Sequence, residues 1–256
     1  MVISISHNLV NYRLVYNSYM IYYEHFCKEH LIMLAVILTV LISSLIYLRK
    51  SKYADTVTKV LSVLLFVCEM TQEILLVHEG RDFIDIMPFH LCNIGIFVNI
   101  LAAFSKGKLQ QFFAEVSLVL IMPGALGAIL FPDWNYRPFF NWLCFMCFFT
   151  HTLLVLIPLT YYVREKIHVS FKHFWYPYAF LGVVTPLIYI LDKKTNTNYM
   201  FLSYPVAHSP LSLTRDIFGK ERYILGLVVL VTIALLFEYT LYTVLGLRKK
   251  KKPTDS

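Results

Sequence analysis

The chain has 256 residues, of which 58% are hydrophobic and 15% are charged, and its formal net charge at neutral pH is +7. Soluble domains carry about 25% charged residues, so this composition excludes a soluble globular protein and indicates an integral membrane protein. The positive charge could suggest a nucleic-acid ligand, but the basic residues follow apolar segments, where they set the orientation of a membrane protein. We therefore expect no nucleic-acid partner.

Seven apolar segments predict an all-α, polytopic membrane helix bundle. A helix needs roughly 20 mostly apolar residues to cross about 30 Å of hydrocarbon. Several segments are short or carry polar residues, so six spans are the fallback, and the weakest segment is 174–191, which Pro177, Gly182 and Pro186 interrupt. The predicted spans cover residues 30–48, 57–77, 87–104, 112–131, 140–162, 174–191 and 223–247.

The chain divides into a short N-terminal segment, one bundle and a tail. Residues 1–29 alternate tyrosines and aliphatic side chains with polar ones, which is typical of a segment at the level of the lipid headgroups. Residues 30–247 form a single transmembrane domain, and residues 248–256 form a basic cytoplasmic tail that should attract anionic headgroups. Membrane phospholipids are therefore the expected partners.

The distribution of Lys and Arg predicts the orientation of the bundle. Fourteen of the 23 lie after odd-numbered spans or in the C-terminal tail, and the other nine lie on the opposite side. The positive-inside rule then puts the N-terminus outside and the C-terminus in the cytoplasm, as for a multi-pass protein of the cell membrane. The long loop 192–222 lies outside in this arrangement, and loops of that length often fold over a site.

Two carboxylates lie within the second predicted span. Glu69 and Glu73 are four positions apart, so they share a helix face. Ionisable groups at this depth are costly and usually face the bundle interior, where they mark function. Alternatively, Glu73 is close enough to the outer end to be solvated, and Glu69 is paired with another buried polar group. The functional reading makes both of them candidates to line a site.

The stretch 86–95 places an imidazole, a thiol and a carboxamide in an otherwise apolar segment, just after Pro88. Pro88 fits the first turn of a helix, where its missing N–H would be unbonded in any case. His90 and Asn93 are three positions apart and share a face. Cys92 is either a small buried hydrophobe, the usual role of a cysteine in a membrane helix, or a reactive thiol.

His151 is the remaining candidate, on the fifth predicted span. It forms one stripe with Cys144 and Cys147. Three ligands over two turns of one helix cannot all reach one ion, and no tetrahedral set has zinc spacing, so we expect no metal. A phosphate-binding glycine loop is also missing, and we expect no cofactor. His151 is either a hydrogen-bonded structural residue or a base, because a neutral imidazole is easier to bury than a charged group.

Five further features of the sequence occur together: Met87-Pro88-Phe89-His90-Leu91-Cys92, Met122-Pro123-Gly124-Ala125, Phe131-Pro132-Asp133-Trp134, His151 and Asn198-Tyr199-Met200-Phe201-Leu202. In this combination the chain resembles the YwaF-like integral membrane family, which includes the eukaryotic transmembrane protein 164. The resemblance covers roughly residues 86–205 well and the first two predicted spans loosely, and it implies a phospholipid acyltransferase. Its acyl group would be carried on a cysteine that matches Cys92, with a histidine that matches His151 as the base and with Asn198 and Tyr199 lining the site.

The leading hypothesis is a lipid acyltransferase or lipid-ester hydrolase that acts through a Cys92 acyl-enzyme. A thiol attacks an ester as the thiolate and needs a base, which a buried neutral imidazole supplies. Counting along the predicted spans puts Cys92 about 7 Å and His151 about 16 Å below the outer surface. His90 and Glu73 match the depth of Cys92 better, so they are second candidates for the base and for an orienting carboxylate.

Two other classes of function stay open at this point. A transporter or channel could use Glu69, Glu73, His151 and Glu238 as a proton or ion path, with the proline-broken fourth and sixth spans as moving parts. A non-catalytic partner in membrane assembly is the third class. The sequence names neither the lipid nor the oligomeric state.

Overall fold

The computed structural model describes residues 24–132, 134, 139–205 and 209–251, and every regular element in those ranges is helical. The segment expected at the headgroups falls largely outside the described residues, as does the end of the basic tail. The elements are α2 (Lys28–Lys50), α3 (Ala54–His78), α4 (Phe83–Ile86), α5 (Leu91–Phe104), α6 (Gly107–Val116), η1 (Ser117–Ile121), α7 (Met122–Leu130), α8 (Trp142–Val163), η2 (Phe171–His173), α9 (Trp175–Thr195), η3 (Tyr199–Phe201), α10 (Pro210–Phe218) and α11 (Tyr223–Lys251).

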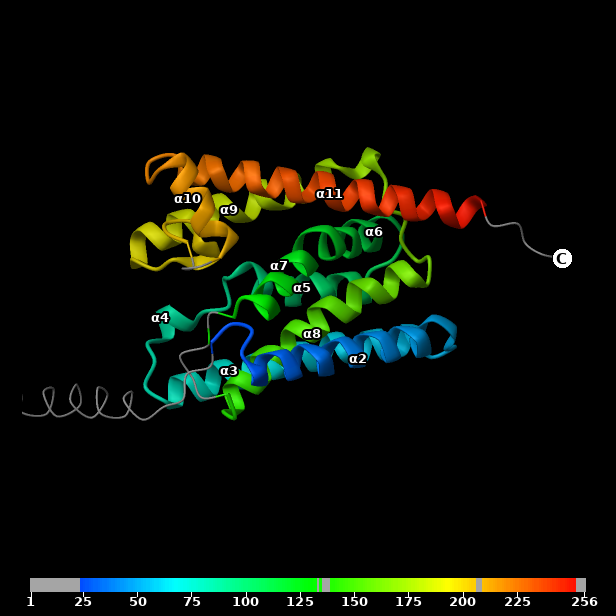
Figure 1. Cartoon of the computed structure of the whole chain (residues 1–256), viewed down its shortest axis with the longest axis horizontal. Coiled ribbons are helices and arrows are strands. Elements are labelled where there is room, and N and C mark those ends of the chain that lie inside the picture. The colour runs from blue at the N-terminus through cyan, green and yellow to red at the C-terminus, as the bar shows by residue number, and fades with distance from the viewer. Residues whose placement is uncertain (1–23, 133, 135–138, 206–208, 252–256) are drawn as a thin grey trace, which may run out of the picture.

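The long helices run side by side, which confirms the predicted polytopic bundle (Figure 1). The sixth predicted span was expected to be the weakest, but α9 continues through Pro177 and Pro186 and is long enough to cross a membrane. Six helical segments meet that length: Lys28–Lys50, Ala54–His78, Gly107–Leu130, Trp142–Val163, Phe171–Thr195 and Tyr223–Gly246.

The short element is α5, which corresponds to the third predicted span. It has 14 residues and a length of about 21 Å, less than the roughly 30 Å of hydrocarbon. The prediction that Pro88 lies in the first helical turn is wrong. Met87 and His90 have extended backbone, with ψ values of 140° and 155°, and the helix begins only at Leu91. A residue before proline is disfavoured in the helical conformation, and this keeps Met87 out of a helix.

Two elements form the centre of the bundle. In the most apolar 18-residue stretch of α8, 72% of the residues are buried, and in that of the rod α6–η1–α7, 61% are buried. In the other four long segments at most 17% of the residues of that stretch are buried. The central residues include Leu118, Ile121, Phe148 and Leu154. The remaining long helices expose apolar side chains, as expected for helices that face lipid.

The rod contains a single π turn, η1, between α6 and α7. Pro123 follows it and lacks the N–H of a regular helix, and π turns are one of the ways in which a helix absorbs such a break. The Ser117 hydroxyl donates to Asn99 Oδ1 at 2.9 Å, and the Asn99 amide donates to the Gly95 carbonyl oxygen at 3.0 Å. The π turn is therefore connected to α5 by a short chain of hydrogen bonds.

Candidate functional site

Polar side chains from three helices meet in the half of the bundle where α5 begins. The side-chain amide of Asn93 on α5 donates a hydrogen bond to Glu69 on α3, which is buried. One turn further along α3, the Gln72 amide oxygen accepts from the thiol of Cys147 on α8 at 3.7 Å. Glu73 lies within hydrogen-bond reach of Glu69. These contacts join α3, α5 and α8 at one level of the bundle.

The same contacts set the depth of Cys92 and His151. Glu69 lies nine positions before the end of α3, which is about 13.5 Å along the helix axis. Asn93 is its partner, so Asn93 and the neighbouring Cys92 lie well below that end. His151 lies nine positions after the start of α8, again about 13.5 Å. Counting along the predicted spans had put the two residues at different depths; the late start of α5 removes most of that difference.

His151 has one ring nitrogen committed to its own helix. Nδ1 lies 2.7 Å from the carbonyl oxygen of Cys147, which can only accept, so in the neutral ring Nδ1 carries the proton and Nε2 is the basic nitrogen. The ring of Trp134 packs over the imidazole at 5.0 Å between centroids. Trp134 is 7% exposed, and its Nε1–H has no acceptor among the described residues. A half-buried base thus lies beside a hydrogen-bond donor.

Cys92 lies in the first turn of α5 and is half-buried. It packs against the central apolar cluster, which includes Cys144 and Phe148 of α8. Helix α5 contacts both α3 and α8, so the helices that carry Cys92 and His151 are direct neighbours. None of the five cysteines is joined to another in a disulfide.

Asn198 and Tyr199 organise the loop that follows α9. Asn198 Oδ1 accepts a hydrogen bond from the backbone N–H of Ser203 at 2.9 Å and so closes the loop on itself. Tyr199 is buried, and its hydroxyl donates to the carbonyl oxygen of Ile84 in α4. Burial raises the pKa of Tyr199 to about 12. Both residues therefore fix the loop in place.

His90 connects this loop to the start of α5. Its ring lies 5.4 Å from the ring of Tyr199 and 5.0 Å from that of Phe201, measured between centroids. The predicted candidates consequently fall into two neighbouring groups. One comprises Glu69, Glu73, Asn93, Cys92 and His151 at the level of the polar contacts, and the other comprises His90, Asn198 and Tyr199 around the start of α5.

Gln72 and Trp134 belong to the first group but were not among the predicted site residues. Gln72 is a polar residue within a predicted span, so the sequence did contain a signal for it. Trp134 follows the fourth span, and only the fold brings it over His151. By contrast, Glu238 of the alternative ion path lies one turn before Tyr242, whose ring contacts Tyr162 at the far end of α8.

A second buried polar cluster lies on α6. Glu115 is fully buried and accepts hydrogen bonds from Gln111 at 2.5 Å and from His173 at 2.8 Å. The hydroxyl of Tyr239 donates to the His173 carbonyl oxygen at 2.9 Å. These contacts tie α6, η2 and α11 together. In the described ranges, no group of three or more His, Cys, Asp or Glu side chains is arranged to hold a metal ion.

The fold and its polar interior define a polytopic α-helical membrane protein with ionisable groups and thiols gathered inside the bundle. The family model of the TMEM164 family matches residues 25–240, and the chain belongs to that family. This match confirms the family resemblance seen in the sequence, including its looser part over the first two spans, and extends it into the last span. No curated protein and no solved structure matches the chain.

Proposed function

We propose that this protein transfers acyl chains between membrane lipids in the cell membrane and that the thiol of Cys92 carries the acyl group. The observation that supports this most directly is the polar contact between Asn93 and Glu69, because it lowers Cys92 to the depth of His151 on the neighbouring helix. A thiol and a base at one depth, next to lipid, are the minimum that this chemistry requires.

The first half-reaction consumes an acyl ester of a phospholipid. The Sγ atom of Cys92 forms a thioester bond to the acyl carbonyl carbon, and the ester C–O bond of the donor lipid breaks. The proton of the thiol passes to Nε2 of His151 and then to the leaving oxygen of the lysolipid, so charge and atoms balance. His151 keeps its Nδ1–H on the Cys147 carbonyl oxygen throughout, which fixes the tautomer.

The second half-reaction regenerates the thiol. A hydroxyl group of an acceptor lipid attacks the thioester and gives its proton to His151, which returns it to the sulfur as the new ester forms. Water as the acceptor would give hydrolysis, and the apolar surroundings of Cys92 in the central cluster disfavour it. The Nε1–H of Trp134 is available to the oxyanion that develops in both steps.

The acyl-enzyme can be detected directly. Purified full-length protein in nanodiscs is incubated with phosphatidylcholine of one acyl composition, digested and analysed by mass spectrometry. We expect one acyl group on the peptide that contains Cys92, removable by neutral hydroxylamine because it is a thioester. Cys92→Ser should lack the hydroxylamine-sensitive adduct, whereas the matched control Cys68→Ser should retain it. An equal thioester yield from the Cys92→Ser protein would refute the proposal.

A further inference from the structure

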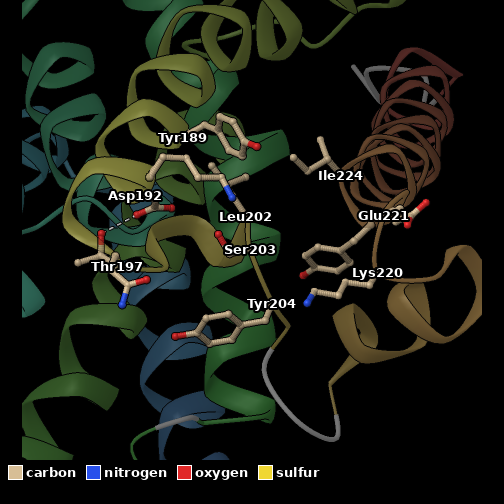
Figure 2. Close-up of a pocket in the computed structure, with 12 residues that line it drawn as sticks. Tyr189, Asp192, Thr197, Leu202, Ser203, Tyr204, Lys220, Glu221 and Ile224 are labelled. Atoms are coloured by element: carbon tan, nitrogen blue, oxygen red, sulfur yellow. Dashed lines mark hydrogen bonds between the residues drawn. The ribbon is translucent and has the colours of Figure 1, made fainter.

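A polar cavity of about 400 Å³ lies at the same end of the bundle as the start of α5. Its walls come from the end of α9, from the loop 196–204 and from the junction of α10 and α11 (Figure 2). Pockets that bind small molecules have volumes of roughly 300–1,000 Å³. Its lining residues come from other elements than α3, α5 and α8, so the cavity is separate from the cluster around Cys92 and His151.

One wall holds a buried carboxylate with an unused oxygen. Asp192 is 2% exposed, and its Oδ1 accepts hydrogen bonds from the Thr197 hydroxyl at 2.8 Å and from the backbone N–H of Tyr199 at 2.9 Å. Its Oδ2 has no partner among the described residues. Leaving such an atom buried and unpaired costs free energy. The unpaired Oδ2 is therefore suited to a ligand group that carries a hydrogen-bond donor or a positive charge.

The facing wall supplies hydrogen-bond donors, one of them positively charged. In Figure 2 the amine of Lys220 is turned toward Tyr204, while the carboxylate of Glu221 points away from the cavity. Tyr223 is 2% exposed, and its hydroxyl has no hydrogen-bond partner in the described part of the chain. Ammonium and hydroxyl donors of this kind bind phosphate oxygens.

Aromatic rings line the space between these two walls. The ring of Tyr189 already accepts a cation, since Nζ of Lys193 lies 5.2 Å from its centroid. Tyr204 also lines the cavity. The faces of tyrosine rings attract ammonium groups, including quaternary ones. The cavity therefore combines acceptors for a cation with donors for an anion.

We infer that this cavity binds a zwitterion with an ammonium group at one end and a phosphate at the other, the ammonium on Asp192 and the phosphate on Lys220 and Tyr223. Headgroups of zwitterionic phospholipids have this chemistry, and so do soluble phosphorylated amines. The loop that forms one wall also holds His90 through the ring of Tyr199. That the ligand is a substrate rests on the proposed acyl transfer, whereas its binding does not.

The inference can be tested by lipid retention. The full-length chain is placed in nanodiscs with equal amounts of phosphatidylcholine, phosphatidylethanolamine and phosphatidylglycerol that share their acyl chains, and the retained lipid is identified by native mass spectrometry. All three lipids carry the phosphate, but the glycerol lipid lacks the ammonium. We expect protein that retains one lipid molecule to carry a zwitterionic lipid in about tenfold excess or more over phosphatidylglycerol. An excess of this size is the effect of one charge-assisted contact. Equal retention of all three would overturn the inference.

Variants assign the effect to the cavity. Asp192→Asn keeps an oxygen for the two loop donors but removes the charge, so the preference for zwitterionic lipids should disappear. Asp216→Asn makes the same change of charge on an exposed position of α10 and should leave the preference intact. Should Asp192→Asn fail to fold, Lys220→Met at an exposed residue should lower the retention of the zwitterionic lipids. A preference unchanged in Asp192→Asn, or retention unchanged in Lys220→Met, counts against the cavity.

Two further measurements separate the possible outcomes. Displacement of the retained lipid by soluble glycerophosphocholine would assign the site to free phosphorylated amines, and the absence of displacement would assign it to lipid. The retention is also measured on Cys92→Ser, which cannot form the thioester. If the wild-type protein prefers zwitterionic lipids but forms no acyl-enzyme, the binding site in the cavity is supported and the proposed acyl transfer is refuted. If it forms the acyl-enzyme but shows no lipid preference, the acyl transfer is supported and the binding site is refuted.

Discussion

At the scale of single residues, the role of His151 can be tested without disturbing its surroundings. Its Nδ1–H bonds to the Cys147 carbonyl oxygen on the same helix, and a glutamine at this position has an amide that can make a similar bond but cannot accept and return a proton. We expect His151→Gln to slow thioester formation by about 10²- to 10⁴-fold with little change in melting temperature. The rate is measured by quenched mass spectrometry, and a rate equal to wild type would mean that another group is the base.

Tyr199 gives a pH-dependent prediction outside the spans. Its hydroxyl bonds to the Ile84 carbonyl oxygen, so Tyr199→Phe should cost about 0.5–1.5 kcal/mol of unfolding free energy. The folded protein raises the pKa of Tyr199 from 10.0 to about 12, so this contribution is complete below the unfolded pKa and is lost as the pH rises through the folded one. The stability difference between wild type and variant should therefore shrink above about pH 10. A difference that stays constant to higher pH would contradict this assignment.

At the scale of elements, the start of α5 decided how well the site could be predicted. The sequence identified Cys92, His151, Glu69 and Asn93 from their polarity in apolar segments. It could not give their relative depth, because the apolar run continues across Pro88 and hides the point where the helix begins. That point follows from tertiary contacts, namely the packing of α5 on α3 and α8, which no local pattern encodes.

The close packing of α5 on the central rod gives the next prediction. A Cβ added to Gly95 would lie 2.3 Å from Cγ2 of Ile121, which is fully buried. Overpacking of this kind costs about 1–3 kcal/mol, so Gly95→Ala should lower the melting temperature. Adding Ile121→Leu, which removes the branch at Cβ, should recover part of the loss. The control is Gly182→Ala on α9, where an added Cβ meets nothing within 4 Å; an equal loss there would show that packing is not the cause.

At the scale of the whole molecule, composition and hydropathy were enough to predict a helical membrane bundle and the approximate positions of its long helices, but not the short helix α10 inside the expected loop 192–222. They could not indicate that α8 and the rod α6–η1–α7 form its centre. Lipid tails are as apolar as a protein core, so a central helix and a lipid-facing helix have similar hydropathy. The sequence also could not predict the cavity beside Asp192, because the cavity is built from the end of one helix, a loop and the start of another helix.

The recessed start of α5 also bears on how often the chain crosses the membrane. The 14 residues of α5 extend about 21 Å, and the helix begins about 13.5 Å below the end of α3. The sum of these two lengths is close to the full length of α3, which has 25 residues. Residues 87–90, which are not helical, would complete a seventh crossing. Such backbone is tolerated at membrane depth only where protein covers it, and the ring of Tyr199 packs on Phe89 at 5.5 Å between centroids.

Seven crossings predict opposite sides for the two ends of this segment. Single cysteines at Arg81 and at Lys106, in a background without the native cysteines, are labelled with a membrane-impermeant maleimide. The positive-inside rule puts Arg81 outside and Lys106 in the cytoplasm, so Arg81→Cys should react in intact cells and Lys106→Cys only after permeabilisation. Reaction of both in intact cells would mean that α5 turns back within the membrane. The Lys166→Cys protein, between α8 and α9, controls for the cytoplasmic side, because α8 is long enough to span the bilayer by itself.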